Sequence, residues 1–407
     1  MIRPSVRRLK ARLGDLTARH RDRHRPTGFG FVLADRIGLV DAGKWDAVAA
    51  HGSFFLRRSV LRVIEDYGPE NVTPRYAMVF RGDTPVAVVA AQIVEIDGRE
   101  HFAPASRKLV ELARKSYRAR LIVAGNLLSW GCDGVAFAPG ESPSELWPAV
   151  AEALYRLRRA HRLEGQAGFQ LVKDLTAAHP EAAALHRFSY RPLETEPNMV
   201  LALDPAWQSY DDYLAALDSK NRRTARDQIK ALDRAGCAVT SLSKAEVALH
   251  ANRLHKLYRA VQQNAAVRLV TVPAGYFPAL ATAAGDDFRC SVIRRGEEIL
   301  GFVSSVRSGP TAVGYYIGFD REAAADGLPL YLRLLHTTIA DAIAWRCHWL
   351  SLGRTALQPK AGLGARPEPM TVWVRHRVPV LNWIVREALG AVPHAEAPVR
   401  NPFKEPQ

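Results

Sequence analysis

Six cationic side chains in one short stretch are the first residues of this chain whose type and spacing could do chemistry. The segment SKNRRTARDQIKALDRAG, residues 219–236, carries six Lys or Arg and only two Asp. On a helix, the cations that share one broad face are Arg222, Arg223, Arg226, Lys230 and Arg234. Guanidinium groups bind phosphate oxygens two at a time. We therefore expect this face to bind an anionic substrate, and the alternative is an ordinary solvated face on an Arg-rich protein.

An amphipathic helix is the element predicted to position these cations. Ala225, Ile229 and Leu232 recur at spacings of four and three, which is the seam that a helix buries. Gly236 follows the last periodic residue, and we expect it to end the helix.

Length and charge bound the class of protein. At 407 residues the chain exceeds the size at which a single hydrophobic core stops growing, so we expect two domains. The net charge of +15 favours a polyanionic partner such as nucleic acid, anionic lipid or a phosphorylated cofactor. Nine Lys or Arg and two Asp give residues 1–25 alone a net charge of +7.

Targeting and metal signals are missing from the sequence. The basic N-terminal segment has no apolar h-region, and no uncharged apolar run of 18 residues occurs, so we expect a cytoplasmic protein. The N-terminal segment predicts either a short amphipathic helix that touches a membrane surface or RNA, or a disordered basic arm. The cysteines form no CxxC or Cys/His cluster, which fits a reducing compartment and gives no metal signal. They are Cys132, Cys237, Cys290 and Cys347.

The same order of predicted elements occurs twice. Residues 76–98 and 290–309 are each predicted to form a hairpin around a tight Arg-Gly-acidic turn. Each hairpin is followed by a strand, a loop, a helix, a strand and a closing apolar strand. These later elements are residues 120–131, 143–161, 168–174 and 197–203 in the first half, and residues 311–318, 330–348, 349–353 and 370–376 in the second. We interpret the pattern as a duplication with a period of about two hundred residues, longer than that of solenoid repeats.

This order resembles the GNAT superfamily of acyltransferases, and its doubling resembles the tandem-GNAT Fem peptidoglycan aminoacyltransferases. Fem-like peptidoglycan-biosynthesis proteins, and GNAT-type acetyltransferase domains of polysaccharide-synthesis loci, open their second domain with a helix similar to LDSKNRRTARDQIKALDRAG. They also carry a "G…K…G" loop similar to LGRTALQPKAGLGA, residues 352–365. The resemblance implies an α/β (α+β) fold with two GNAT-like domains, each a mixed, mostly antiparallel sheet flanked by helices. We expect a basic arm at 1–28, a degenerate GNAT-like domain at 29–203, the acyltransferase domain at 204–385 and a tail at 386–407.

The resemblance also implies where an acyl donor binds. In a GNAT site two central strands splay, and backbone N–H groups stabilise the oxyanion that develops on the donor carbonyl. We expect these groups at Val313, Gly314 and Ile317. A phosphate of the donor is expected at the start of the next helix, at Gly327, Leu328, Leu330 and Tyr331. The family signature Arg/Gln-x-x-Gly-x-Gly/Ala is absent there, and REAAADGLPL takes its place. The implied donor is acyl-CoA, with acetyl-CoA first and aminoacyl-tRNA as the alternative, and no metal is implied.

Proton transfer in such a site needs a side chain that can relay a proton. The candidates are Tyr315, Tyr316, Tyr331, His336 and Lys360. Tyr315 and Tyr316 are neighbours on a predicted strand, so we expect one to face the cleft and the other the opposite sheet face. Lys360 is expected in a Gly-rich loop beside the late strand, where it meets an anion together with Gly353 and Arg354, and the alternative is an ordinary exposed loop lysine. His336 is expected to be an ordinary helix histidine.

The first half is expected to serve the acceptor. Trp130 and Asp133 lie near the equivalent cleft there, and the alternative for Trp130 is a plain core residue. We expect Arg222, Arg223, Arg226 and Lys230 to bind the phosphates of a lipid-linked or nucleotide-linked acceptor, or of tRNA.

The leading hypothesis is a tandem-GNAT acyl- or aminoacyltransferase that acts on a cell-envelope or polysaccharide precursor. The protein would work in the cytoplasm, with peripheral contact to the inner face of the membrane. The rival is a non-catalytic protein that binds nucleic acid or anionic membrane through its basic surface. The sequence contains no Walker loop, GxGxxG, HExxH or GxSxG motif, so we do not expect an NTPase, a dehydrogenase, a zincin or a hydrolase.

Overall fold

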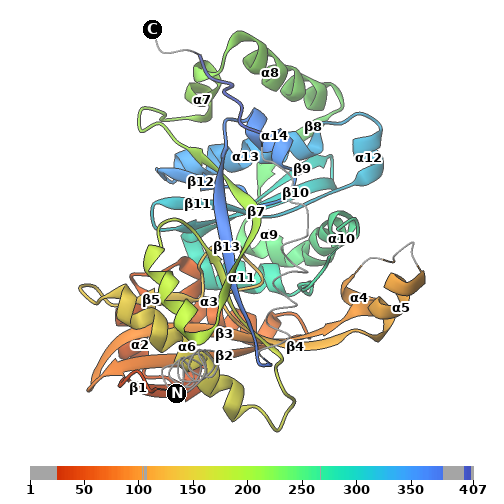
Figure 1. Ribbon diagram of the computed structural model, residues 1–407. Helices are drawn as coiled ribbons and strands as arrows, with labels where there is room; N and C mark the ends of the chain where they lie inside the picture. The colour runs from red at the N-terminus through yellow and green to blue at the C-terminus, as the bar shows by residue number, and fades with distance from the viewer. Residues whose placement is uncertain (1–24, 103, 105–107, 266, 379–397, 405–407) are drawn as a thin grey trace, which may run out of the picture.

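One mixed β-sheet runs through the molecule and is flanked by helices (Figure 1). The computed structural model describes residues 25–102, 104, 108–265, 267–378 and 398–404. Most of the predicted basic arm and of the predicted tail lies outside these residues. Among the described strands, parallel pairing occurs only between β4 and β6 and between β11 and β12. The predicted fold class, a mixed and mostly antiparallel sheet with flanking helices, is therefore confirmed.

The first half begins with a short strand, continues with short helices, and then forms its other strands around one long helix. Its elements are β1 (Gly30–Ala34), η1 (Ile37–Leu39), α2 (Ala42–Ala49), η2 (Phe54–Leu56), α3 (Arg58–Tyr67), β2 (Val72–Arg81), β3 (Thr84–Asp97), α4 (Gly98–His101), α5 (Lys108–Ser116), β4 (Arg118–Ala124), β5 (Val135–Phe137), α6 (Pro143–Ala160), β6 (Phe169–Leu175), η3 (Pro180–Phe188) and β7 (Arg191–Ala202). The predicted hairpin is β2–β3.

The second half repeats the hairpin, strand, helix and strand in the same order. Its elements are α7 (Tyr210–Ala216), α8 (Ser219–Arg234), β8 (Cys237–Ser241), α9 (Lys244–Leu249), α10 (Ala251–Gln262), α11 (Tyr276–Ala284), η4 (Gly285–Asp287), β9 (Phe288–Arg295), β10 (Glu298–Ser308), β11 (Thr311–Phe319), α12 (Arg321–Ala325), α13 (Leu330–Ala344), β12 (Trp349–Ser351), α14 (Leu357–Gly362) and β13 (Arg366–His376). The predicted hairpin is β9–β10.

Helix α8 forms where the apolar spacing predicts it. The Asp218 side chain accepts the Asn221 N–H and caps the first turn. Ala225 and Leu232 are buried against the second half. Gly236 follows the helix with φ +67, a left-handed conformation that glycine adopts without strain.

The strand order repeats within the single sheet. The order is β1-β2-β3-β4-β6-β13-β7-β12-β11-β10-β9-β8, and β5 pairs with β3. From each outer edge inward, a strand, a hairpin, a central strand and its parallel partner follow one another. The duplication is therefore visible in the topology, but the expectation of two separate sheets is wrong.

The closing strands of the two halves are exchanged, and this exchange joins the sheets. β7 ends the first half in sequence but pairs with β12 and β13 of the second. β13 ends the second half and pairs with β6 of the first. Each parallel strand pair is thus completed by the other half's strand, because an unpaired central edge would leave backbone N–H and C=O groups unsatisfied.

A shared hydrophobic core lies between the halves. One buried cluster combines Trp45 and Phe55 of the first half with Tyr276, Phe277 and Phe302 of the second. Helix α3 packs against α11 across this boundary. Arg57 of the first half forms an ion pair at 2.6 Å with Asp287 of the second. The halves therefore form one packed body, which holds the site at their junction.

Candidate active site

A gap between two neighbouring strands of the second half is the candidate donor site. β11 and β12 pair over three positions only, the last being Val313 opposite Ser351. Beyond Val313, β11 follows β10 alone. After Ser351 the chain turns toward β7, where the Leu352 N–H donates to the Met199 carbonyl oxygen. The gap therefore opens at Val313 and Gly314, within the segment predicted to supply oxyanion-stabilising N–H groups.

A β-bulge lies beside the opening of this gap. On β11, Tyr315 and Tyr316 lie opposite the single residue Ser304 of β10, because the pairing register shifts there. The Ser304 hydroxyl accepts the Tyr316 N–H at 3.0 Å. A bulge bends its strand and re-aims its backbone groups, which explains why β11 leaves β12 at this point.

Because of the bulge, the prediction that Tyr315 and Tyr316 lie on opposite faces of the sheet is wrong. Tyr315 and Tyr316 pack in the same core cluster, and their ring centroids are 4.5 Å apart. Side chains alternate only along a regular strand, and the extra residue of a bulge puts two neighbours on one face.

The two tyrosine hydroxyls are buried and hydrogen-bonded. The Tyr315 hydroxyl lies 2.7 Å from the Tyr276 hydroxyl of α11. The Tyr316 hydroxyl donates to the Leu128 carbonyl oxygen at 3.2 Å. Burial raises the pKa of Tyr315 and of Tyr316 well above the ordinary value. Both hydroxyls therefore stay protonated at neutral pH, which suits a proton donor rather than a general base.

A cavity of about 830 Å³, here called the junction cavity, lies where the two halves meet. Its walls combine the exchanged strands β7 and β13 with β11, β12 and the loop before β5. The lining includes Trp130, Asp133, Asn198, Val313, Ser351, Arg366 and Glu368. Val313 and Ser351 are the last paired residues of β11 and β12, so the gap opens onto this cavity.

A polar network fixes the wall of the junction cavity. The Trp130 indole N–H donates to the Ser351 hydroxyl at 2.7 Å, and that hydroxyl donates to Asn198 Oδ1 at 3.0 Å. The same oxygen accepts the Gly353 N–H at 3.1 Å. Asn198 Nδ2 donates to Glu368 at 3.3 Å. The sequence left Trp130 as either a cleft residue or a core residue. In the structure this first-half residue contacts Ser351 of β12 in the second half.

Asp133 is a buried carboxyl on the same wall. It is 9% exposed and accepts the Ser129 hydroxyl at 2.6 Å. Burial raises the pKa of Asp133 above its ordinary value. A carboxyl in this state takes up a proton more readily than an exposed one.

The prediction that Lys360 lies in an exposed loop is wrong. Lys360 belongs to the short helix α14 and is 3% exposed. Its amine donates to the Gly353 carbonyl oxygen at 3.2 Å, beside the end of β12. Burial lowers the pKa of Lys360 to about 7. Two of the residues expected to act together, Gly353 and Lys360, are therefore in contact.

Comparison with known proteins finds a similarity within the second half. Residues 219–361 match the family model described as acetyltransferase (GNAT) domain. This part of the second half is therefore similar to a GNAT domain. No curated protein sequence matches the chain significantly.

Solved structures with a similar arrangement include FemX, with 11% identity, coverage of 81% of this chain and 97% of that chain, and a TM-score of 0.47. A tandem GNAT protein from the clavulanic acid biosynthesis pathway matches with 14% identity, coverage of 86% and 99%, and a TM-score of 0.48. L-PGS from Bacillus licheniformis matches with 10% identity, coverage of 82% and 96%, and a TM-score of 0.44.

Three N–H groups at the start of α13, where a GNAT domain is expected to bind the donor phosphates, are internally bonded. The Gly327 and Leu328 N–H groups donate to the carbonyl oxygens of Ala324 and Ala323, and the Leu330 N–H donates to that of Leu328. Helix α12 supplies two of these acceptors, and the Leu330 side chain is fully buried. N–H groups that are already bonded cannot receive a phosphate. The N–H groups of Gly327, Leu328 and Leu330 therefore do not fit the diphosphate of CoA, against our expectation for these three residues.

Tyr331 and Ile317 lie near this helix start but contribute apolar surface. Both are partly buried and pack against a core cluster of the second half. Burial raises the pKa of Tyr331 to about 12, so its hydroxyl stays protonated. His336, further along α13, is buried, and burial lowers its pKa to about 3. Its Nδ1 atom has no hydrogen-bond partner among the described residues.

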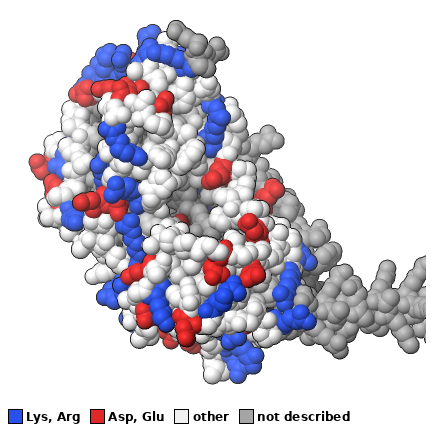
Figure 2. All heavy atoms as spheres, turned by 90° about the vertical axis from the view of Figure 1, so that its left-hand side faces the viewer, with Lys and Arg blue, Asp and Glu red and all other residues white. Residues whose placement is uncertain are grey.

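The cations of α8 lie at the outer end of the second half, away from the residues that line the junction cavity (Figure 1). Figure 2 shows Lys and Arg side chains gathered at that end of the molecule. The Arg223 side chain is 86% exposed, and Arg226 and Lys230 are exposed as well. Arg222 differs, because its guanidinium donates to the Ala215 and Leu217 carbonyl oxygens at the end of α7. Arg223, Arg226 and Lys230 are therefore exposed on the helix, with Arg223 3.8 Å from Asp227, while Arg222 has a structural contact.

The equivalent gap in the first half is filled. There β4 and β6 pair up to Ala124, and Gly125 follows with φ +140. A Cβ atom at Gly125 would lie 2.8 Å from the Lys173 side chain, which occupies the space. The Lys173 amine forms a buried ion pair with Asp174 and donates to the Ser129 carbonyl oxygen at 2.8 Å. This geometry leaves the second half as the place for a donor.

Asp174 also links the two halves. It is fully buried and accepts the Arg354 guanidinium at 3.0 Å. Arg354, predicted to bind substrate, is thus anchored by the first half, with 30% of its side chain exposed. Lys173 and Asp174 were missed by sequence reasoning, although two opposite charges at the end of the apolar strand GFQLVKD were a signal for a buried pair.

The described residues contain no group of three or more His, Cys, Asp or Glu side chains placed to hold a metal ion. No helix in the described part of the chain is both long enough and apolar enough to cross a membrane.

Proposed function

We propose that the protein moves an acetyl or aminoacyl group onto an amine or hydroxyl of a cell-envelope or polysaccharide precursor. The observation that carries the proposal is the gap between β11 and β12, which opens beside a β-bulge onto the junction cavity. A donor carbonyl in this gap would meet backbone N–H groups of β11, and an acceptor in the junction cavity would approach it from the other half.

The side chains around the gap have distinct proposed roles. Tyr315 donates a proton to the leaving group, with Tyr316 as the second candidate, because both hydroxyls are held protonated by burial. Trp130 and Ser351 position the acceptor. Lys360 holds the Gly353 carbonyl, and its low pKa leaves part of the population neutral at pH 7, so that it can also take up a proton.

The proposal also concerns the molecule that carries the acyl group. Acyl-CoA is the usual donor of GNAT domains, but the internally bonded start of α13 does not fit its diphosphate. Aminoacyl-tRNA is the alternative, and the exposed cations of α8 suit contact with its phosphates. The envelope or polysaccharide acceptor rests on the similarity of LDSKNRRTARDQIKALDRAG to Fem-like proteins. We place the reaction in the cytoplasm, at the inner face of the membrane.

The test is a transfer assay with both donor classes. Full-length protein is incubated with labelled acetyl-CoA or with a labelled aminoacyl-tRNA mixture, together with lipid-linked and nucleotide-linked precursors extracted from bacterial envelopes. We expect label in a precursor with one donor class. Trp130→Phe should reduce the rate because it loses the bond to Ser351, whereas Trp147→Phe, in the core of the first half, should not. Transfer from neither donor would contradict the proposal.

A binding protein without catalysis remains the second candidate, favoured by the exposed cations of α8. It predicts that the protein binds RNA with a steep dependence on salt, while no acyl transfer occurs with either donor. The same samples can be used for both measurements.

A further inference from the structure

The end of helix α6 carries arginines that no acid compensates. Arg159 and Arg162 are exposed, and Arg158 is partly buried. The buried Nε atom of Arg158 has no hydrogen-bond partner in the described part of the chain. Among the described residues, no carboxylate forms an ion pair with any of these three side chains. Uncompensated charge of one sign attracts an anionic partner.

The end of β13 brings a further arginine to the same place. Arg377 is exposed, and its N–H donates to the Gly168 carbonyl oxygen at 2.9 Å, so the strand end lies beside the loop between α6 and β6. Burial lowers the pKa of Arg158, and the positive charges of Arg375 and Arg377 lower it further. The fold therefore keeps these like charges close to one another although they repel.

The acids at this end of the molecule are already matched by other arginines. The ion pairs join Glu152 to Arg156, Asp35 and Glu164 to Arg75, and Glu95 and Glu164 to Arg120. These four acids and three arginines leave Arg158, Arg159, Arg162 and Arg377 without a partner among the described residues. Seven arginines against four acids give an excess of three positive charges.

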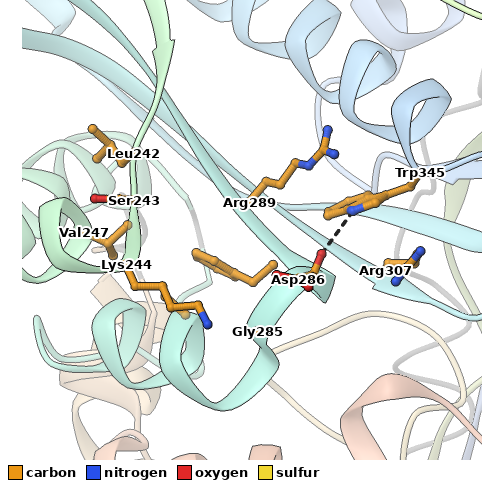
Figure 3. A pocket seen from close by; sticks show the side chains of 11 residues that line it. Leu242, Ser243, Lys244, Val247, Gly285, Asp286, Arg289, Arg307 and Trp345 are labelled. Carbon is orange, nitrogen blue, oxygen red and sulfur yellow. Dashed lines mark hydrogen bonds between the residues drawn. The ribbon is translucent and has the colours of Figure 1, made fainter.

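A cavity at the edge of the second half shows the contrast (Figure 3). In this cavity of about 430 Å³, Arg289 pairs with Asp341 at 3.3 Å, and Arg307 pairs with Asp287. These two arginines are held by acids of the fold. The arginines at the end of α6 have no such acids, so their charge is available to a partner.

Two exposed apolar side chains lie among the uncompensated arginines. Leu163 directly follows Arg162 and is 92% exposed, and Val378 directly follows Arg377 and is 37% exposed. A single exposed leucine is ordinary. Aliphatic side chains between cations suit a membrane interface, where the cations meet lipid phosphates and the apolar groups enter the acyl region. Nucleic acid offers phosphates but no apolar phase for aliphatic side chains.

The basic N-terminal segment joins the fold at the same helix. The Thr27 N–H and hydroxyl both donate to the Glu152 carboxylate of α6, at 2.8 and 2.7 Å. Glu152 lies about two helical turns before Arg159. Residues 1–24 precede this anchor and contain eight Lys or Arg and two Asp. In Figure 1, α6 and the end of β13 lie in the lower part of the view, and α8 lies at the top.

We propose that this surface, here called the α6 patch, binds a membrane that contains anionic lipids. The α6 patch consists of Arg158, Arg159, Arg162, Leu163, Arg377 and Val378. The guanidinium groups bond to lipid phosphates, and the two aliphatic side chains enter the boundary between head groups and acyl chains. Each cation near an anionic membrane strengthens binding roughly fivefold. The contact needs no acyl transfer, so this proposal and the proposed function can fail separately.

Arg159 and Arg162 are the residues to change, since both are exposed and neither has an ion-pair partner among the described residues. Arg159→Gln combined with Arg162→Gln removes two charges from the α6 patch. Lys244→Gln combined with Lys256→Gln removes the same charge from two exposed lysines of the second half and is the matched control. Leu163→Ser tests the apolar contact without a change of charge. Thermal unfolding shows that each variant is folded.

Sedimentation of the full-length protein with lipid vesicles tests the proposal. Vesicles of phosphatidylcholine and phosphatidylglycerol, in a ratio of about two to one, present an anionic surface, and vesicles of phosphatidylcholine alone present a neutral one. We expect saturable binding to the anionic vesicles and roughly tenfold weaker binding to the neutral ones. The double arginine variant should bind the anionic vesicles about tenfold more weakly, and the lysine control should bind like the unchanged protein. Leu163→Ser should bind severalfold more weakly.

Three results would overturn the proposal: equal binding to both kinds of vesicle, an equal loss in the lysine control, or a Leu163→Ser variant that binds anionic vesicles like the unchanged protein. An equal loss in the lysine control would mean that only net charge matters. A single-stranded RNA probe identifies the other possible partner. If the double arginine variant loses RNA binding while its vesicle binding is unchanged, the α6 patch is a nucleic-acid surface instead.

Discussion

Lys360 is buried in the fold, although its neighbours in sequence indicate an exposed loop. Its amine is buried in the second half and contacts the Gly353 carbonyl oxygen. A buried ammonium loses the hydration that it has in the unfolded chain, which explains the low pKa. Its burial is therefore a constraint on stability as well as on chemistry.

Replacement of Lys360 by Met should change how the free energy of unfolding depends on pH. The folded pKa is about 7 and the ordinary value is 10.5, so the unfolded chain binds more protons between these values. The wild-type free energy of unfolding should therefore rise with pH in this window, by at most about 1.4 kcal/mol per pH unit relative to Lys360→Met. Below pH 7 both states carry the proton and the difference should be constant.

Urea unfolding of both proteins from pH 6 to pH 9.5 measures the difference. Parallel curves over the whole range would show that Lys360 is not buried as described.

Tyr315 and Tyr276, whose hydroxyls are in contact, allow a comparison of two matched variants. Tyr315→Phe and Tyr276→Phe each remove the 2.7 Å contact, and each should lower stability by about 1 kcal/mol. If Tyr315 is the proton donor, only Tyr315→Phe should also reduce the transfer rate, by roughly a hundredfold. The measurements are thermal unfolding and initial rates. Equal losses of rate in both variants would assign Tyr315 a structural role only.

Among the elements, those with local signals were predictable from the sequence. Gly82 and Gly296 in the sequence predict the hairpins β2–β3 and β9–β10, and both residues adopt the positive φ values that suit a tight turn. Helix α8 follows from its apolar spacing. The bulge on β11 does not, because Tyr315 and Tyr316 have the same local pattern whether or not an extra residue is inserted.

The burial of Lys360 was likewise beyond local sequence. The segment LQPKAG has the composition of an exposed loop, and its contacts with β7 and with the end of β12 make it an interior helix. The internally bonded start of α13 could be anticipated in part, since REAAADGLPL lacks the glycine signature that keeps N–H groups free. Pairing partners far apart in the chain decide these features.

The exposed cations of helix α8 give a further prediction. Arg223→Gln combined with Arg226→Gln should raise KM several-fold and weaken the dependence of binding on salt, if the helix contacts substrate phosphates. The free energy of unfolding should change by less than about 0.5 kcal/mol, because both side chains are exposed and the Arg223–Asp227 pair is a surface contact.

Arg222→Gln is the control for the α8 variant, and it should behave in the opposite way. It loses two bonds to the end of α7, so stability should fall while KM stays unchanged. An unchanged KM in the double variant would mean that the basic face is only a solvated surface.

For the whole molecule, the exchanged strands predict that neither half folds alone. Residues 1–203 would leave β6 and β7 without β13, and residues 204–407 would leave β12 and β13 without β7. The shared core would also be cut open. We expect each fragment to be insoluble when expressed alone and the two to copurify when expressed together. A soluble fragment 204–407 with cooperative thermal unfolding would contradict this.

The position of β13 near the end of the chain has a further consequence for synthesis on the ribosome. The first half cannot complete its sheet when its own residues have emerged, because Arg366–His376 is still to be translated. Until then β6 and β7 expose strand edges that can pair with other nascent chains. The partly made chain is therefore exposed to wrong strand pairing until β13 has emerged, and slow translation should lower its soluble yield.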